Sequence, residues 1–205
     1  MPRALSTLLL FFIVLWLPAT AAAEKSILVM GDSLSSAYGI PQRRGWVALL
    51  EERLKREHPD YIVVNASISG ETSGGGRARL KPLLARHRPA IVILALGGND
   101  GLRGMPITQV RTNLAASIRE AQASGARVLL VGVKMPPNYG EVYTQGFDAS
   151  FVELAKTHRA ALVPFLLEDF AGKPEFFLPD RIHPAEEAQP LMLERVWPAL
   201  RPLLN

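Results

Sequence analysis

The sequence contains no cysteine among its 205 residues. Disulfide bonds, thiolate ligands for a metal ion, a cysteine nucleophile and the acceptor thiol of a lipoprotein are therefore excluded. A chain without cross-links must be stabilised by its hydrophobic core alone, and a chain of this length can bury such a core within one domain. We expect neither a metal ion nor a cofactor.

Long runs of one charge sign are also missing. The chain has 23 Lys and Arg against 19 Asp and Glu, and the two signs mix within short segments such as EERLKREH at 51–58. Such mixing is typical of a solvated surface, and no basic stripe with interleaved aromatic residues indicates a nucleic-acid groove. We expect small-molecule partners, no nucleic acid, and a monomeric protein.

The one long hydrophobic run stands at the beginning of the chain. Arg3 and the α-amino group give a positive start, residues 4–17 are uncharged and apolar, Pro18 ends the run, and three alanines follow at 21–23. This order of features is the pattern of a secretory signal peptide, so we predict one over residues 1–23.

A membrane anchor is the alternative interpretation of this run. The run is shorter than the roughly 20 residues that span a bilayer, and no basic stop-transfer cluster follows it. We therefore expect cleavage before Glu24, or alternatively before Ala22, and one domain over residues 24–205. The cleaved protein would keep no stable membrane anchor.

Short apolar runs recur along the rest of the chain. They are continuous rather than alternating, as is typical of parallel strands covered on both faces, and their starts lie roughly 30–35 residues apart, the length of a β-α-β unit. The expected strands are residues 26–30, 61–66, 90–96, 126–133 and 161–165. Between them, helical patterns begin at Trp46 and cover 76–88, 107–123, 146–159 and 186–202. This order predicts a flavodoxin-like, three-layer α/β/α sandwich with a roughly five-stranded parallel sheet.

Ser33 lies where such folds bind ligands, outside the carboxyl end of a strand. It directly follows the first expected strand in the segment GDSLS, and Gly31 permits a sharp turn before it. A serine hydroxyl becomes a nucleophile when a base takes its proton. The alternative role for Ser33 is an ordinary helix N-cap.

His183 is the best-placed histidine to act as that base. It lies in the loop segment LPDRIHPAEE, whereas the other histidines lie at a helix end or in charged helical segments. Asp180 precedes it by three residues, so a carboxylate can accept a hydrogen bond from Nδ1–H and leave Nε2 to face a serine, as in a catalytic triad. The alternative is an Asp-initiated turn that carries an exposed histidine.

Gly70 and Asn99 are candidates to stabilise a negatively charged oxygen. Gly70 follows the second expected strand and can offer its backbone N–H, while Asn99 follows the third and can offer its side-chain amide. The backbone N–H of Ser33 can add a further donor. Such donors stabilise the oxyanion that forms during acyl transfer. Both residues are also common in ordinary turns.

Taken together, four segments resemble the blocks of the SGNH (GDSL) hydrolases. They are GDSLS at 31–35, the glycine of SISGETS, GGND at 97–100 and DRIH at 180–183. The segments LALGGNDGLRG, MPPNYG and IHPAEEAQP look like the bacterial periplasmic thioesterase I/protease I/lysophospholipase L1 branch. The resemblance implies a metal-free, periplasmic esterase and thioesterase of broad substrate range. It further implies Ser33, Asp180 and His183 as the triad, and Ser33, Gly70 and Asn99 as the oxyanion hole.

Acyl selectivity would require an apolar groove beside Ser33. The candidates, which follow strands at the same edge of the expected sheet, are Leu34, Leu102, Met135, Pro136 and Tyr139; ordinary loop packing is the alternative for them. We also expect the glycines at 74–76 to form a mobile loop that responds to a long acyl chain, with a plain helix start as the alternative. Two rival functions remain open: a carbohydrate-acetyl esterase, and a non-enzymatic flavodoxin-like binding protein.

Overall fold

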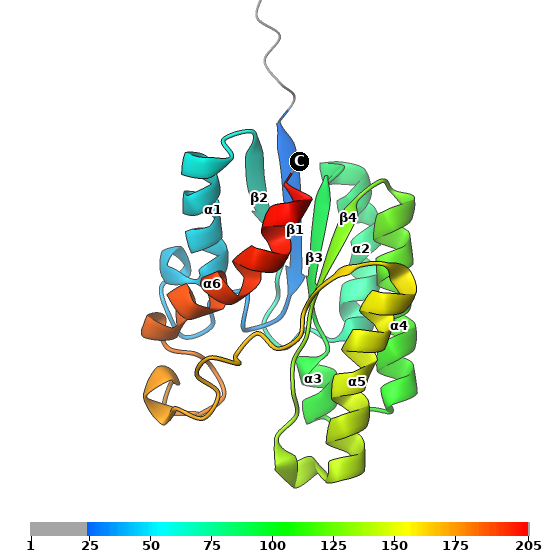
Figure 1. The fold of residues 1–205 in the computed structure, drawn as a ribbon, viewed down its shortest axis with the longest axis vertical. Coiled ribbons are helices and arrows are strands. Elements are labelled where there is room, and N and C mark those ends of the chain that lie inside the picture. Colours follow the sequence, from blue (N-terminus) through cyan, green and yellow to red (C-terminus); the bar gives the residue numbers. More distant parts are fainter. Residues whose placement is uncertain (1–23, 205) are drawn as a thin grey trace, which may run out of the picture.

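The computed structural model describes residues 24–204, and its centre is a five-stranded parallel sheet (Figure 1). The strand order is β2-β1-β3-β4-β5. The strands are β1 (Lys25–Gly31), β2 (Tyr61–Asn65), β3 (Ile91–Ala95), β4 (Arg127–Val131) and β5 (Ala161–Val163). The predicted doubly covered parallel sheet is confirmed.

Helices cover both faces of this sheet, which confirms the three-layer sandwich (Figure 1). One face carries α1 (Trp46–Glu57) and α6 (Gln189–Leu200), and the other carries α2 (Ser73–His87), α4 (Ile107–Ala123) and α5 (Glu141–His158). A short helix, α3 (Gly98–Leu102), follows β3 directly. Five 3-10 turns complete the described chain: η1 (Gln42–Arg44), η2 (Pro137–Tyr139), η3 (Pro174–Phe176), η4 (Glu186–Ala188) and η5 (Arg201–Leu203).

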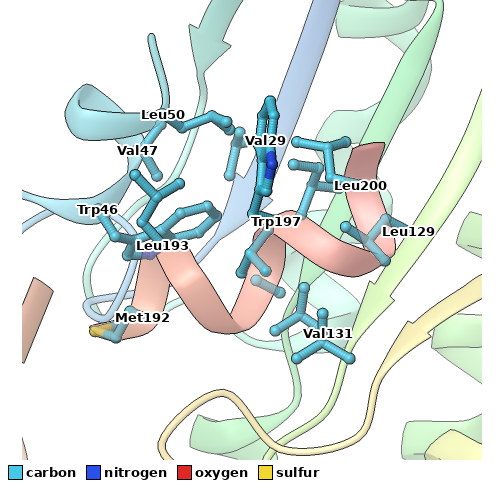
Figure 2. Packing of buried hydrophobic residues seen from close by; sticks show 14 of the residues in the cluster. Val29, Trp46, Val47, Leu50, Leu129, Val131, Met192, Leu193, Trp197 and Leu200 are labelled. Carbon is cyan, nitrogen blue, oxygen red and sulfur yellow. The ribbon is translucent and has the colours of Figure 1, made fainter. Parts of the chain in front are cut away.

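Successive residues of each central strand pack into two different cores. Ile27 and Val29 belong to the cluster under α1 and α6, whereas Leu28 and Met30 belong to the cluster under α2, α4 and α5. Side chains alternate across a strand, so a strand buried on both faces must be apolar at every position. Figure 2 shows part of the first cluster, where Trp197 of α6 lies close to Val29 of β1.

The glycines at 74–76 lie in the first turn of α2, so the expected loop is wrong and the alternative, a helix start, is confirmed. Thr72 caps this helix, because its side-chain oxygen accepts a hydrogen bond from the Gly75 N–H at 3.1 Å. A Cβ on Gly76 would lie 2.3 Å from a methyl group of Leu96. The glycine there allows α2 to pack closely on the segment after β3.

The carboxyl ends of β1 and β3 meet at the point where the chain order reverses. From β1 the chain crosses to β2 on one side, and it then returns to β3 on the other side. Ligands of open α/β sheets bind at such a switch point. The beginning of β1 and the carboxyl terminus both lie at the opposite end of the molecule (Figure 1). In the described part of the chain, none of the helices combines the length and apolar character that crossing a membrane requires.

Candidate active site

The chain leaves β1 and reaches Ser33 through Gly31, at a place too crowded for any other residue. A Cβ added to Gly31 would lie 2.6 Å from the Cβ of Ser35 and 2.8 Å from the hydroxyl of Ser67. These contacts are shorter than packed atoms allow, so the close approach of the two loops requires glycine at this position. The turn presents the half-buried Ser33 at the carboxyl edge of the sheet.

His183 and Asp180 form a close pair in the loop before α6. The Nδ1 atom of His183 lies 2.6 Å from Oδ2 of Asp180. The other carboxylate oxygen accepts the backbone N–H groups of Ile182 at 2.9 Å and His183 at 3.0 Å. These hydrogen bonds, led by those from His183, lower the pKa of Asp180 to about 2. The carboxylate therefore stays ionised and fixes the imidazole with Nε2 directed away from it.

Ser33 and His183 line the same cavity, of about 590 Å³. No hydrogen bond involves the Ser33 hydroxyl within residues 24–204. Catalytic hydrogen bonds are often long in substrate-free enzymes and shorten in the complex with substrate. The ring of Tyr38 packs against the imidazole ring, with 4.3 Å between the ring centres.

Asn99 also lines this cavity, and it extends from α3. Its amide nitrogen donates to the carbonyl oxygen of Glu71 at 3.0 Å and to Oδ2 of Asp32 at 3.4 Å. Gly70 lies beside it in a turn in which the Glu71 N–H donates to the carbonyl of Ile68. The φ angle of Gly70 is 80°, a value that glycine adopts without strain. Gly70 is outside the cavity lining itself.

Four of the five expected acyl-binding residues line the cavity. These are Leu34, Leu102, Met135 and Pro136. Tyr139 does not line it; its hydroxyl instead donates to the carbonyl of Leu102 at 2.8 Å and so ties η2 to the end of α3. The remaining lining is mostly apolar and comes from residues that sequence reasoning did not assign to the site: Val133, Pro137, Phe165, Leu167, Ala171, Phe177 and Ile182. Two of these residues had a signal: Ile182 lies within the D-x-x-H segment, and Pro137 lies within the segment MPPNYG.

Asp32 is a buried carboxylate that sequence reasoning missed. It is 4% exposed and lines the cavity between Ser33 and Asn99. Burial raises its pKa to about 6, against the lowering effect of the Leu34 N–H, which donates to Oδ1 at 3.0 Å, and of His183. Its position directly before Ser33 was the one feature of the sequence that could have indicated a place in the site.

Asp100 fixes the helix that carries Asn99. Its carboxylate is fully buried and accepts the backbone N–H of Ser73 at 2.8 Å and the Ser73 hydroxyl at 2.5 Å. Asn113 of α4 donates to the same hydroxyl at 3.2 Å. These bonds join α3 to the first turn of α2 and to α4, so the position of the Asn99 amide is set by three elements.

Comparisons with known proteins agree with this geometry. Residues 29–189 match the GDSL-like Lipase/Acylhydrolase family. The chain is 53% identical over 183 residues to esterase TesA of Pseudomonas aeruginosa, which covers 89% of this chain and 91% of that protein. It is 40% identical over 195 residues to thioesterase 1/protease 1/lysophospholipase L1 of Escherichia coli K12, covering 95% of this chain and 92% of that one.

A solved structure supports the same assignment. The psychrotrophic esterase EstA from Pseudoalteromonas, in a structure inhibited by monoethylphosphonate, matches with a TM-score of 0.84 and 42% identity. The match covers 88% of this chain and 99% of that one. Sequence and structure together show that this chain belongs to the GDSL-like lipase/acylhydrolase family and is an ester hydrolase.

Proposed function

We propose that the chain hydrolyses acyl esters and acyl thioesters, with Ser33 as nucleophile, His183 as general base and Asp180 as the orienting carboxylate. One observation carries this proposal: the hydroxyl-bearing turn after β1 and the Asp180-paired imidazole line one largely apolar cavity. Nothing in a cofactor-binding module would require that pairing.

The first half of the proposed reaction acylates the enzyme. Nε2 of His183 takes the hydroxyl proton as Ser33 Oγ attacks the substrate carbonyl carbon. The resulting oxyanion is stabilised by backbone N–H groups of Ser33 and Gly70 and by the amide of Asn99. His183 then gives its proton to the departing alcohol or thiol as the bond between the carbonyl carbon and the leaving group breaks, which leaves an acyl-serine.

The second half returns the enzyme to its starting state. His183 takes a proton from water, and the hydroxide attacks the acyl carbon of the intermediate. When the tetrahedral state collapses, the bond to Ser33 Oγ breaks and His183 returns the proton to that oxygen. The product is the free acid. The proposed steps consume only the substrate and one water molecule.

The cavity lining favours apolar acyl chains as substrates. Side chains such as Met135, Phe165 and Phe177 surround the space beside Ser33. We propose aryl esters, acyl-CoA thioesters and lysophospholipids as substrates, because all three join an apolar acyl group to a good or soluble leaving group. A carbohydrate-acetyl esterase would need polar side chains to hold a sugar, which makes it the weaker candidate.

The test is a comparison of Ser33→Ala with Ser36→Ala. Ser36 lies in the same turn. Its hydroxyl bonds that of Ser69 at 2.8 Å and donates to the backbone carbonyl of Ser33 at 3.5 Å, so its loss affects one short exposed hydrogen bond and one long one. We expect Ser33→Ala to fold normally, to lose essentially all esterase turnover, and to escape covalent labelling by a fluorophosphonate. Ser36→Ala should keep turnover and labelling. Near-parental activity of Ser33→Ala would refute the proposal.

We further propose that residues 1–23, which lie outside the described residues, are a signal peptide, and that the mature protein acts as a monomer in the periplasm. The family membership of the chain and the resemblance of its segments to a periplasmic branch support this location. Amino-terminal sequencing of the exported protein should begin at Glu24 or Ala22. A protein that stays in the membrane fraction with an intact leader would contradict the proposal.

A further inference from the structure

Arg181 adopts a backbone conformation that favours glycine. Its φ angle is 59°, in the left-handed region that residues with a long side chain rarely occupy. The position requires this conformation, because the chain folds back here: the Arg181 N–H donates to the carbonyl of Leu178 at 2.8 Å, and the Leu178 N–H donates to the carbonyl of His183 at 2.8 Å. A glycine would make the same turn without strain, so the turn itself does not explain an arginine.

Arg181 lines the cavity that Ser33 and His183 also line, and the residue is exposed. No ion pair involves its guanidinium among residues 24–204. The neighbouring Asp180 is already bound to the imidazole and to two backbone N–H groups. A guanidinium in this position is therefore available to a ligand.

Lys134, the other cation that lines the cavity, is engaged elsewhere. Its ammonium group lies 3.3 Å from the carboxylate of Glu168 and 5.1 Å from the centre of the Phe165 ring. The cavity is otherwise mostly apolar. Arg181 is thus the cation best able to set which charged substrates enter.

The place of Arg181 relative to His183 decides which part of the substrate it meets. In the proposed mechanism His183 gives its proton to the leaving group, so the leaving group must lie beside the imidazole. Arg181 is two residues before His183 in the same turn, whereas the acyl chain occupies the apolar lining. A guanidinium binds phosphate oxygens through paired hydrogen bonds.

We propose that Arg181 forms a phosphate-binding subsite for the leaving group, which selects acyl esters or thioesters whose alcohol or thiol carries a phosphate. This inference rests on the proposed function. The phosphate can belong to a nucleotide-bearing thiol, as in acyl-CoA, or to a glycerol headgroup, as in a lysophospholipid. The recognition chemistry is the same for both.

The test compares matched substrates with one acyl chain on the wild-type protein and Arg181→Gly. One pair is octanoyl-CoA and the uncharged octanoyl-N-acetylcysteamine thioester; the other is octanoyl-lysophosphatidylglycerol and monooctanoylglycerol. We expect Arg181→Gly to lower kcat/KM about tenfold for a phosphate-bearing substrate, near the lower end of what a charge-assisted hydrogen bond supplies, mainly through KM. The uncharged partners should be unaffected, and the wild-type preference should weaken as salt screens the charge.

Arg181→Gln is a second variant that keeps a polar, though shorter, side chain and removes the charge. It should show the same selective loss, whereas Arg181→Lys should keep part of the preference. A loss confined to octanoyl-CoA would assign the subsite to the thiol, and a loss confined to the lysophospholipid would assign it to the headgroup; both support the proposal. An equal effect on charged and uncharged substrates, or no effect at all, would overturn it. Absence of wild-type activity on all four substrates would instead refute the proposed function.

Discussion

Replacing Asp32 by asparagine should make the protein more stable and less active. The carboxylate is 4% exposed, and burial raises its pKa from the ordinary value of 3.8 to about 6. The ionised form is therefore disfavoured in the folded protein relative to the unfolded chain. An asparagine keeps an oxygen to accept the Leu34 N–H and carries no charge to desolvate.

The pH dependence of this effect follows from the direction of the pKa shift. The folded pKa lies above the unfolded one, so the stability that protonated Asp32 contributes is fully present below pH 3.8 and is lost as the pH rises through about 6. Above that pH the charge costs at most about 3 kcal/mol, from 1.36 kcal/mol per pKa unit. The new amide would face the Asn99 nitrogen as donor against donor, which offsets part of the gain, so we expect a net gain of about 1–2 kcal/mol.

Urea unfolding followed by tryptophan fluorescence measures this difference. The gain of Asp32→Asn over the wild type should be near zero at about pH 3.5, increase between about pH 4 and pH 6, and stay constant at higher pH. Asp169→Asn, at an exposed position, should give no such pH-dependent difference. Lower stability of Asp32→Asn than of the wild type at about pH 8, or a gain independent of pH, would refute the reasoning. The variant should also lose kcat, because Asp32 lies between Ser33 and the Asn99 amide.

Three further substitutions test the site and the core. Asn99→Ala should lower kcat by about 10²–10³ with little change in KM, because one oxyanion donor is lost; an unchanged kcat would remove this residue from the hole. Because the pKa of Asp180 is lowered to about 2, Asp180→Asn should lower kcat by about 10³–10⁴ at every pH above about 4, and a loss limited to high pH would contradict the orienting role. Trp197→Ala, in the core under α6, should cost about 3–5 kcal/mol in urea unfolding. Val152→Ala, at an exposed position on α5, is its control, and a loss below about 1 kcal/mol in Trp197→Ala would contradict the packing argument.

The strands could be predicted because burial on both faces leaves a direct mark on the sequence. Their ends were less visible, since apolar character alone does not show where pairing stops. The last strand was expected to reach residue 165, but β5 ends at Val163, before Pro164, which has no N–H to donate to a sheet. The expected strand at 90–96 likewise includes Ala90 and Leu96, which are apolar and lie just outside β3.

Helix starts were harder to predict where a helix is exposed. Helix α5 begins at Glu141, five residues before the expected start, because Gly140 with a φ angle of 88° turns the chain into it. In its first turn Val142 is 89% exposed and only Tyr143 packs against the core, so the apolar periodicity there is weak. Helix α6 begins at Gln189 instead of 186, since residues 186–188 form a 3-10 turn. Helix α3 was not expected, because its five residues include two glycines.

The residues of the candidate site also fall into two groups, those that the sequence could predict and those that it could not. Ser33, Asp180, His183 and Asn99 could be selected from the sequence because few residue types can perform their proposed chemistry, and their spacing limits the choice further. Asp32 and Asp100 could not, since their importance comes from burial and from partners distant in the chain, such as the Ser73 hydroxyl. The apolar lining was only partly found, because a phenylalanine that faces a cavity has the same sequence signature as one in the core.

The opposite placement of chain ends and cavity has a practical consequence. The start of β1 and the carboxyl terminus both lie at the end of the molecule away from the cavity (Figure 1). A resin or carrier coupled through either end would therefore leave the cavity open to the solvent. Immobilised preparations made this way should retain their turnover, whereas random coupling through lysines, including Lys134 on the cavity lining, should block a share of the molecules.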